Sequence, residues 1–281
     1  MTEVKTGTLA VPGAVLHYDV RASEASAQPV LLLIGSPMEA DGFAPLAERF
    51  DDRTVVTYDP RGVGRSQRAD GGNGSAPQEH ADDLHRLIGA LGAGPVDIFG
   101  SSGGAVNGLA LVARHPEQVR TLVAHEPPTA EVLPDGDVLR ATCEDIHATY
   151  LRSGFGPAMA KFIAMVSQQG PLPADLASRP GPDPAAFGLP AADDGSRDHP
   201  LLGRHMILCT HYQHDFAALA AAPTRIVLGV GADSAAQMPG RAAVAMAARL
   251  GTAAVTFPGD HNGFGSQPDA FAVTLRQVLD G

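Results

Sequence analysis

The sequence predicts an α/β fold in which a mostly parallel sheet is flanked by helices. Short apolar runs alternate with segments of helical periodicity from residue 30 to residue 126, the pattern expected of a sheet with helices on both faces. The chain has 281 residues, of which 44% are hydrophobic and 18% are charged, so it suits one large α/β domain with an insertion. This composition excludes a disordered or fibrous chain.

The expected elements follow in order along the chain. Residues 7–20 alternate apolar and polar side chains around Pro12-Gly13, which predicts an opening antiparallel hairpin. Four apolar runs are expected to form the next strands: residues 30–34, 54–58, 95–99 and 120–126. Helices are expected at residues 77–91, where apolar side chains recur at helical spacing, and at residues 105–114.

The pattern changes after Pro127-Pro128. Residues 129–215 contain no convincing strand, have helical stretches near 137–152 and 157–169, and include a Pro/Gly/Asp-rich segment at 170–200. Strands resume at 224–230 and 253–257, and a closing helix is expected at 268–279. We therefore expect a core of residues 1–128 and 216–281, with residues 129–215 as a helical insertion.

Gly100-Ser101-Ser102-Gly103-Gly104 is the most informative motif. It fits G-x-S-x-G at the place where the strand at 95–99 must turn sharply into a helix. The small residues allow the strand and the helix to approach closely, and the central serine is held at a strained turn. The motif predicts that Ser102, rather than Ser101, is a nucleophile.

A serine hydroxyl needs a base, and the base needs a group that orients it. His261 follows the last expected strand in the glycine-flanked loop Pro258-Gly259-Asp260-His261-Asn262-Gly263, from which it could reach over the sheet edge. Asp233 and Glu126 both lie just past the carboxyl end of an expected strand, and both preserve the chain order serine, acid, histidine. We expect Asp233 to be the acid and keep Glu126 as the alternative.

With these residues in place, the chain resembles the α/β-hydrolase superfamily over nearly its whole length. Besides the serine motif and the histidine loop, Tyr58-Asp59-Pro60-Arg61-Gly62-Val63-Gly64-Arg65-Ser66 is similar to the family's D-x-R-G-x-G-x-S stretch. The segment ending in Ile34-Gly35-Ser36 is similar to the family's oxyanion-hole segment, although Ile34 replaces the usual histidine. The resemblance implies that the backbone N–H groups of Ser36 and Gly103 form the oxyanion hole. It also implies that the insertion is a cap over the active site.

These residues predict a serine hydrolase that cleaves a small to medium, fairly uncharged ester through an acyl-enzyme. A lactonase, thioesterase, carbon–carbon bond hydrolase or perhydrolase would use the same residues. A tailoring enzyme of secondary metabolism or a ligand receptor on the same fold is the alternative from another class, since a fold does not fix a function. An intact set of serine, histidine and acid favours the hydrolase.

Charge and composition bear on the partners. The formal net charge is −11 and no basic cluster is present, so we expect no nucleic-acid partner. The N-terminal segment, residues 1–5, is polar, and no run approaches the ~18 apolar residues of a membrane span, so a cytoplasmic protein without membrane partners is expected.

Cys143 and Cys209 are expected to be buried free thiols. His211 and His214 have a spacing that could suit a metal, but no carboxylate–histidine pair accompanies them. We expect no metal or cofactor, and the oligomeric state stays open.

The insertion also contains bulky apolar residues at helical spacing that could face a substrate. We interpret them mainly as packing between the insertion and the core. They are Tyr150, Phe155, Met159, Phe162, Met165 and Met206.

Overall fold

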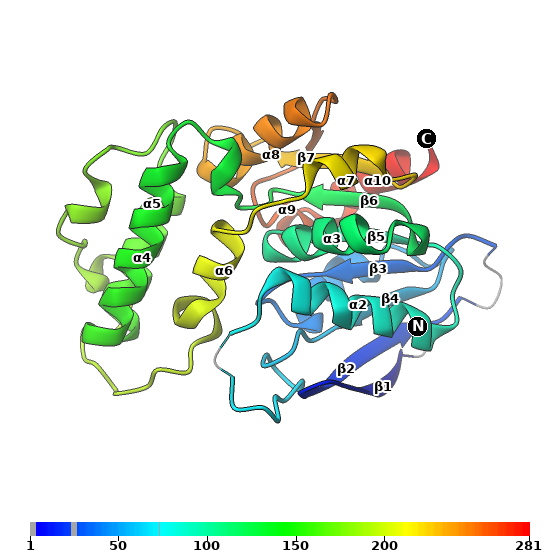
Figure 1. Ribbon diagram of the computed structural model, residues 1–281, viewed down its shortest axis with the longest axis horizontal. Coiled ribbons are helices and arrows are strands. Elements are labelled where there is room, and N and C mark those ends of the chain that lie inside the picture. The colour runs from blue at the N-terminus through cyan, green and yellow to red at the C-terminus, as the bar shows by residue number, and fades with distance from the viewer. Residues whose placement is uncertain (1–3, 24–26, 73) are drawn as a thin grey trace.

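The computed structural model describes residues 4–23, 27–72 and 74–281, so Met1 to Glu3 of the polar N-terminal segment lie outside the described residues. Its centre is an eight-stranded sheet with the order β1-β2-β4-β3-β5-β6-β7-β8 (Figure 1). The strands are β1 (Val4–Val11), β2 (Ala14–Arg21), β3 (Leu31–Ile34), β4 (Val55–Tyr58), β5 (Val96–Ser101), β6 (Val119–His125), β7 (Arg225–Gly231) and β8 (Val255–Phe257). The β1–β2 and β2–β4 pairs are antiparallel, and all other neighbours are parallel. The predicted mostly parallel sheet is confirmed.

Helices cover both faces of this sheet. One face packs against α2 (Pro77–Leu91), α3 (Gly103–Arg114), α7 (Phe216–Ala221) and α8 (Met238–Arg249). The other face packs against α1 (Ala44–Ala47), α9 (Gly263–Ser266) and α10 (Pro268–Asp280). Each helix buries an apolar stripe on apolar strand residues, so the sheet is the middle layer of a three-layer sandwich.

The bounds of α2 illustrate why the sequence predicted several elements well. Pro77 occupies the first helical position, where its missing N–H costs nothing and its fixed φ suits a helix. Gly92 ends the helix in the left-handed region with φ 61°, which glycine adopts without a steric penalty. In contrast, α8 was not expected, because its Ala-rich sequence gives little contrast between an apolar and a polar face.

Residues 129–215 leave the sheet after β6 and return before β7. They contain α4 (Gly136–Ser153), α5 (Phe155–Val166) and α6 (Met206–Thr210), which lie together to one side of the sheet, at the left of Figure 1. Within the described part of the chain, this insertion has no strand. It has its own apolar cluster, which extends to Met238 and Ala242 of α8.

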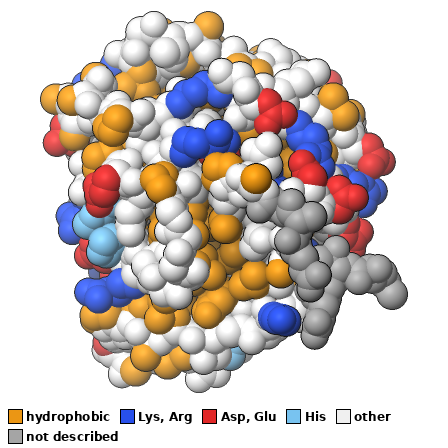
Figure 2. All heavy atoms as spheres, turned by 90° about the vertical axis from the view of Figure 1, so that its right-hand side faces the viewer, with side chains coloured by type: hydrophobic (Ala, Val, Ile, Leu, Met, Phe, Trp, Pro, Cys, Tyr) orange, Lys and Arg blue, Asp and Glu red, His pale blue; other side chains and the backbone are white. Residues whose placement is uncertain are grey.

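The end of the molecule opposite the insertion carries both signs of charge. Figure 2 shows basic and acidic side chains interspersed on this face, with apolar side chains between them. Across the described segments, no helix combines the length and the apolar character needed to cross a membrane.

Candidate active site

Ser102 lies at the turn between β5 and α3, as the G-x-S-x-G motif predicted. Its backbone has φ 56° and ψ −123°, which is a strained conformation for a residue with a side chain. The Ser102 N–H donates to the His125 carbonyl at 2.9 Å, and the Ser102 carbonyl accepts from Ala105 at 3.0 Å. These bonds hold the strained turn in place.

Two glycines allow this turn to be so tight. A Cβ on Gly104 would lie 2.2 Å from the carbonyl oxygen of Ile34 on the neighbouring strand β3. A Cβ on Gly100 would lie 2.9 Å from the carbonyl oxygen of Gly104 itself. Real Cβ atoms do not approach backbone so closely, so the strand and helix could not meet in this way with larger residues.

His261 is held by Glu126 and not by Asp233. The imidazole Nδ1 of His261 lies 2.6 Å from a carboxylate oxygen of Glu126. Asp233 is exposed, and its backbone N–H donates to the carbonyl of Gly259. The expectation that Asp233 would orient His261 is therefore wrong in this structure, and the alternative, Glu126, occupies that position.

The strand order explains this outcome. β6 lies directly beside β5, and His125 pairs in register with Ser101, so Glu126 and Ser102 are level at the same sheet edge. Asp233 follows β7, one strand further away, on a turn that directs it to solvent. This turn instead supplies Ser234, whose buried hydroxyl donates to Glu126.

The Glu126 carboxylate is completely buried and fully bonded. One oxygen accepts from the Gly231 N–H at 2.9 Å and from the Ser234 hydroxyl at 2.6 Å, while the other faces His261. Burial by itself would raise the pKa of Glu126, but the hydrogen bonds from His261 and Ser234 hold this pKa below its ordinary value. Glu126 is therefore an anionic carboxylate at neutral pH.

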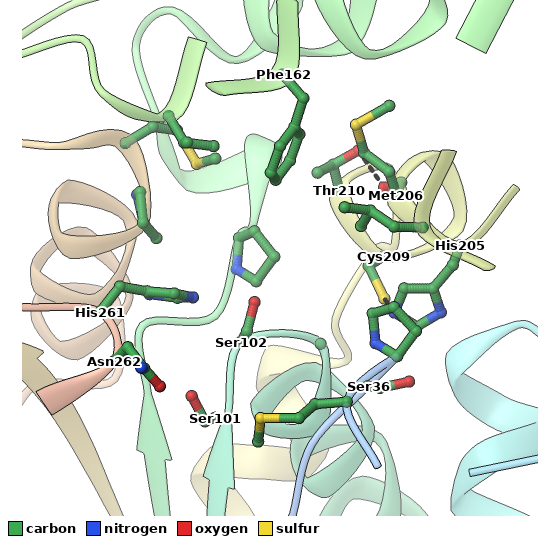
Figure 3. Close-up of a pocket in the computed structure, with 18 of the residues that line it drawn as sticks. Ser36, Ser101, Ser102, Phe162, His205, Met206, Cys209, Thr210, His261 and Asn262 are labelled. Carbon is green, nitrogen blue, oxygen red and sulfur yellow. Dashed lines mark hydrogen bonds between the residues drawn. The ribbon is translucent and has the colours of Figure 1, made fainter. Parts of the chain in front are cut away.

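Ser102 and His261 line the same cavity, which has a volume of about 400 Å³ (Figure 3). Figure 3 shows the imidazole of His261 and the hydroxyl of Ser102 both pointing into it. Most of the remaining lining is apolar: Pro37, Met38, Pro128, Phe162, Met165, Val166, Leu201, Met206, Met238, Pro239 and Phe264. The cavity therefore suits an uncharged group beside the serine.

The bulky apolar residues of the insertion fall into two groups, those that line the cavity and those that do not. Phe162, Met165 and Met206 line it, so they face the space beside Ser102 as well as packing within the insertion. Tyr150, Phe155 and Met159 pack in the apolar cluster of the insertion itself, whereas we expected the whole set to pack between the insertion and the core.

The two expected oxyanion-hole residues lie side by side next to Ser102. Ser36 and Gly103 both line the cavity, and a Cβ on Gly103 would lie 2.4 Å from the Ser36 carbonyl oxygen. Gly103 is the first residue of the 12-residue helix α3, whose N-terminal end favours negative charge. Ile34, which replaces the usual histidine, is buried below them.

Sequence reasoning gave no catalytic role to two further residues that the structure places at the site, His205 and Cys209. His205 lines the cavity from a π-helical turn (Leu201–His205) of the insertion, and Cys209 lies one turn further on, with its Sγ 3.3 Å from His205 Nε2. Burial lowers the pKa of His205 to about 4, so its imidazole is neutral at pH 7. Both cysteines are buried free thiols, as predicted.

His125 lies behind the site at the end of β6. Its ring centroid is 6.2 Å from that of His261, and it packs against Phe257 and Phe271. Burial is the main cause that lowers the pKa of His125 to about 4. The residue is thus a neutral packing group beneath the Glu126–His261 pair.

The D-x-R-G-x-G-x-S segment forms a framework beside the site. Asp59 accepts hydrogen bonds from the backbone N–H groups of Ala40 and Arg65, and Ser66 donates to the Asp59 carbonyl. Arg61 forms a buried ion pair with Asp83 of α2. These bonds fix the loop after β4 against the rest of the core.

Comparison with known proteins agrees with this architecture. A family profile described as alpha/beta hydrolase fold matches residues 28–181. The chain is 33% identical to an uncharacterized hydrolase, YraK, of Bacillus subtilis, over 99% of this chain and 97% of that protein. It is 30% identical to a 2-(acetamidomethylene)succinate hydrolase of Mesorhizobium japonicum, over 60% of this chain and 64% of that protein.

Solved structures show the same fold at lower identity. The enol-lactonase of Burkholderia xenovorans LB400 has a TM-score of 0.67 at 20% identity, covering 98% of this chain and 100% of that one. A thermophilic esterase of Thermogutta terrifontis has a TM-score of 0.69 at 20% identity, covering 98% of both chains. The chain therefore belongs to the α/β-hydrolase family. Within that family, it is a hydrolase.

Proposed function

We propose that this protein is a carboxylic ester hydrolase that acts on small to medium, fairly uncharged esters through an acyl-enzyme on Ser102. One observation carries the proposal: His261, bound to the buried carboxylate of Glu126, lines the same apolar cavity as Ser102. A nucleophile, a base and an orienting acid are the groups that acyl transfer requires.

In the proposed reaction, the Ser102 hydroxyl oxygen attacks the ester carbonyl carbon while His261 Nε2 takes the hydroxyl proton. The carbonyl oxygen becomes an oxyanion, which the N–H groups of Ser36 and Gly103 stabilise. His261 then returns the proton to the departing alkoxide, which leaves as an alcohol. A water molecule repeats these steps on the acyl-enzyme and releases the acid.

Glu126 has an orienting role in this mechanism. Its carboxylate accepts a hydrogen bond from the Nδ1–H group of His261, so Nε2 is left free to act as the base. It also stabilises the imidazolium that forms during the attack. The buried bonds from Gly231 and Ser234 fix the position of the carboxylate and therefore of the imidazole.

We further propose that residues 129–215 act as a cap that selects the substrate. Phe162, Met165 and Met206 supply apolar walls on the insertion side of the cavity, opposite the core residues that carry the reaction. Apolar walls favour an acyl or alcohol group without charge next to the scissile bond.

An active-site-directed fluorophosphonate probe tests the proposal, because it labels an activated serine covalently. We expect the wild type to be labelled at Ser102 and to hydrolyse 4-nitrophenyl esters of short and medium acyl length, and we expect Ser102→Ala to do neither. A folded wild-type protein that neither reacts with the probe nor cleaves any ester, thioester or lactone would favour a non-hydrolytic binding protein.

A further inference from the structure

The apolar lining of the cavity beside Ser102 differs in composition from the core of the protein. The cluster that packs α2 and α3 on the sheet consists mostly of Leu, Ile, Val and Ala side chains. Among the described residues that line the cavity, only Val166 and Leu201 carry a branched aliphatic side chain. The rest of the apolar lining consists of prolines, phenylalanines, methionines and one cysteine. The cavity therefore presents rings and sulfur atoms where the core presents aliphatic chains.

Two phenylalanine rings line the cavity, one from the core and one from the insertion. Phe264 of α9 packs against three other phenylalanines of the core, with ring centroids 5.2 to 6.1 Å apart. Phe162 of α5 is only partly buried, and it has no ring partner within the described part of the chain. Figure 3 shows its ring extending from the insertion into the cavity, toward Ser102. Phe162 thus offers an unpaired aromatic ring to a bound group.

Three methionines reach the cavity from three different helices. Met165 of α5, Met206 of α6 and Met238 of α8 line it, and each is at most 4% exposed. Thioether sulfur makes favourable contacts with aromatic rings, and the unbranched methionine side chain adapts to the shape of its neighbour. Because the methionines come from separate helices, a ring held in the cavity would meet thioether groups from several directions.

Polar side chains on the insertion side of the cavity are already bonded within the insertion. The hydroxyl of Thr210 donates to the carbonyl of Met206 at 2.8 Å, and His205 Nε2 lies 3.3 Å from the Sγ atom of Cys209. No Asp, Glu, Lys or Arg is among the described residues that line the cavity. This side of the cavity therefore offers ring and sulfur contacts rather than charges.

We propose that the cavity binds an aromatic ring of the substrate, with Phe162 as the partner of that ring. Aromatic rings pair edge to face or in offset stacks. An apolar cavity of about 150 Å³ can hold benzene, so a volume of about 400 Å³ has room for a phenyl ring and the ester next to it. The ring belongs either to the acyl part or to the alcohol part of the ester. Its role as a substrate group rests on the proposed ester hydrolysis, whereas its binding does not.

Two amides with the same carbon skeleton isolate the contribution of the ring. Isothermal titration calorimetry on Ser102→Ala, which prevents turnover, would compare phenylacetamide with cyclohexylacetamide. The cyclohexyl group has the larger apolar surface, so burial alone favours cyclohexylacetamide. Contacts with rings and sulfur favour phenylacetamide, which we expect to bind about fivefold more tightly. Equal or tighter binding of cyclohexylacetamide, or no saturable binding of either amide, would overturn the proposal.

Phe162→Leu, made in the Ser102→Ala protein, removes the ring but keeps an apolar side chain. We expect it to weaken the Kd of phenylacetamide about fivefold and that of cyclohexylacetamide about twofold or less. Phe155→Leu is the matched control, because Phe155 is also on α5 and packs in the insertion but does not line the cavity. It should leave both Kd values unchanged, and equal effects of the two leucine variants would overturn the proposal.

Matched esters then show which part of the substrate carries the ring. If it is the acyl part, the ratio of kcat/KM for methyl phenylacetate to that for methyl cyclohexylacetate should fall about fivefold in Phe162→Leu. If it is the alcohol part, the ratio for benzyl acetate to cyclohexylmethyl acetate should fall instead. Comparing each ratio between the wild type and the variant cancels the intrinsic reactivity of the esters. Unchanged ratios in both pairs would overturn the assignment of the ring to the substrate. A wild type that hydrolyses none of these esters and no 4-nitrophenyl ester would contradict the proposed function, while calorimetry still decides whether the cavity binds the ring.

Discussion

The Nδ1 atom of His261 lies 2.6 Å from the buried carboxylate of Glu126, 135 residues earlier in the chain. This contact joins the loop after β8 to the end of β6, directly beside the strand that precedes Ser102. Because Glu126 binds His261, Asp233 does not have the orienting role that its position in the sequence favoured.

The contact makes Glu126→Gln the decisive substitution. An amide in place of the carboxylate would favour the wrong imidazole tautomer, so we expect kcat/KM to fall on the order of 10³ to 10⁴-fold. Asp233→Asn is the matched control. Because Asp233 is exposed, this substitution should lower kcat/KM about twofold or less. Steady-state kinetics on a 4-nitrophenyl ester measures both, and losses in the opposite order would return Asp233 to the mechanism.

Alanine substitutions at the neighbouring Ser101 and Ser102 test which of the two serines is the nucleophile. Ser102→Ala should lower kcat on the order of 10³-fold or more, because only binding and the oxyanion hole remain. Ser101→Ala should be mild, since Ser101 ends β5 and lies outside the strained turn. Circular dichroism would confirm that both variants fold, and retained activity in Ser102→Ala alone would exclude Ser102 as the nucleophile.

His261→Ala should cost about as much as Ser102→Ala, and the double variant should lose little more. Residues that act as one unit have non-additive effects, because either substitution already abolishes the shared step. Independent, multiplicative losses in the double variant would remove His261 from the mechanism.

Ser234→Ala tests whether the hydrogen bond from the Ser234 hydroxyl to Glu126 contributes to catalysis. Without the Ser234 hydroxyl, the negative charge of Glu126 is less stabilised, so the pKa of Glu126 rises. We expect activity to decrease about tenfold or less, and the acid limb of the pH profile of kcat/KM to move to higher pH. Ser178→Ala, which alters an exposed hydroxyl of the insertion, should leave the profile unchanged.

Alanine substitutions at two helical glycines test the close approach of α3 to β3 beneath Ser102. Gly104→Ala would place a Cβ 2.2 Å from the Ile34 carbonyl oxygen, so we expect the free energy of unfolding to fall by about 3 kcal/mol or more. Gly89→Ala in α2 has open space around it and should raise the free energy of unfolding by about 0.5–1 kcal/mol. Urea denaturation measures both, and equal effects would contradict the packing argument.

The sequence by itself determined the elements and the residues whose signals are local. The apolar runs predicted the strands, Pro77 and the following periodicity predicted α2, and the glycines around Ser102 predicted the sharp turn. Each signal depends on neighbours a few residues apart, because backbone conformation and the burial of one face are set at that range.

Only the tertiary structure decided which acid meets His261 and where the cavity lies. Glu126 and Asp233 have the same local signature, and the choice between them depends on strand order and on a turn that directs Asp233 to solvent and Ser234 inward. The rings of His80 and His205 likewise contact each other, although 125 residues separate them in the sequence. Such contacts arise from the packing of distant elements, to which short-range periodicity is insensitive.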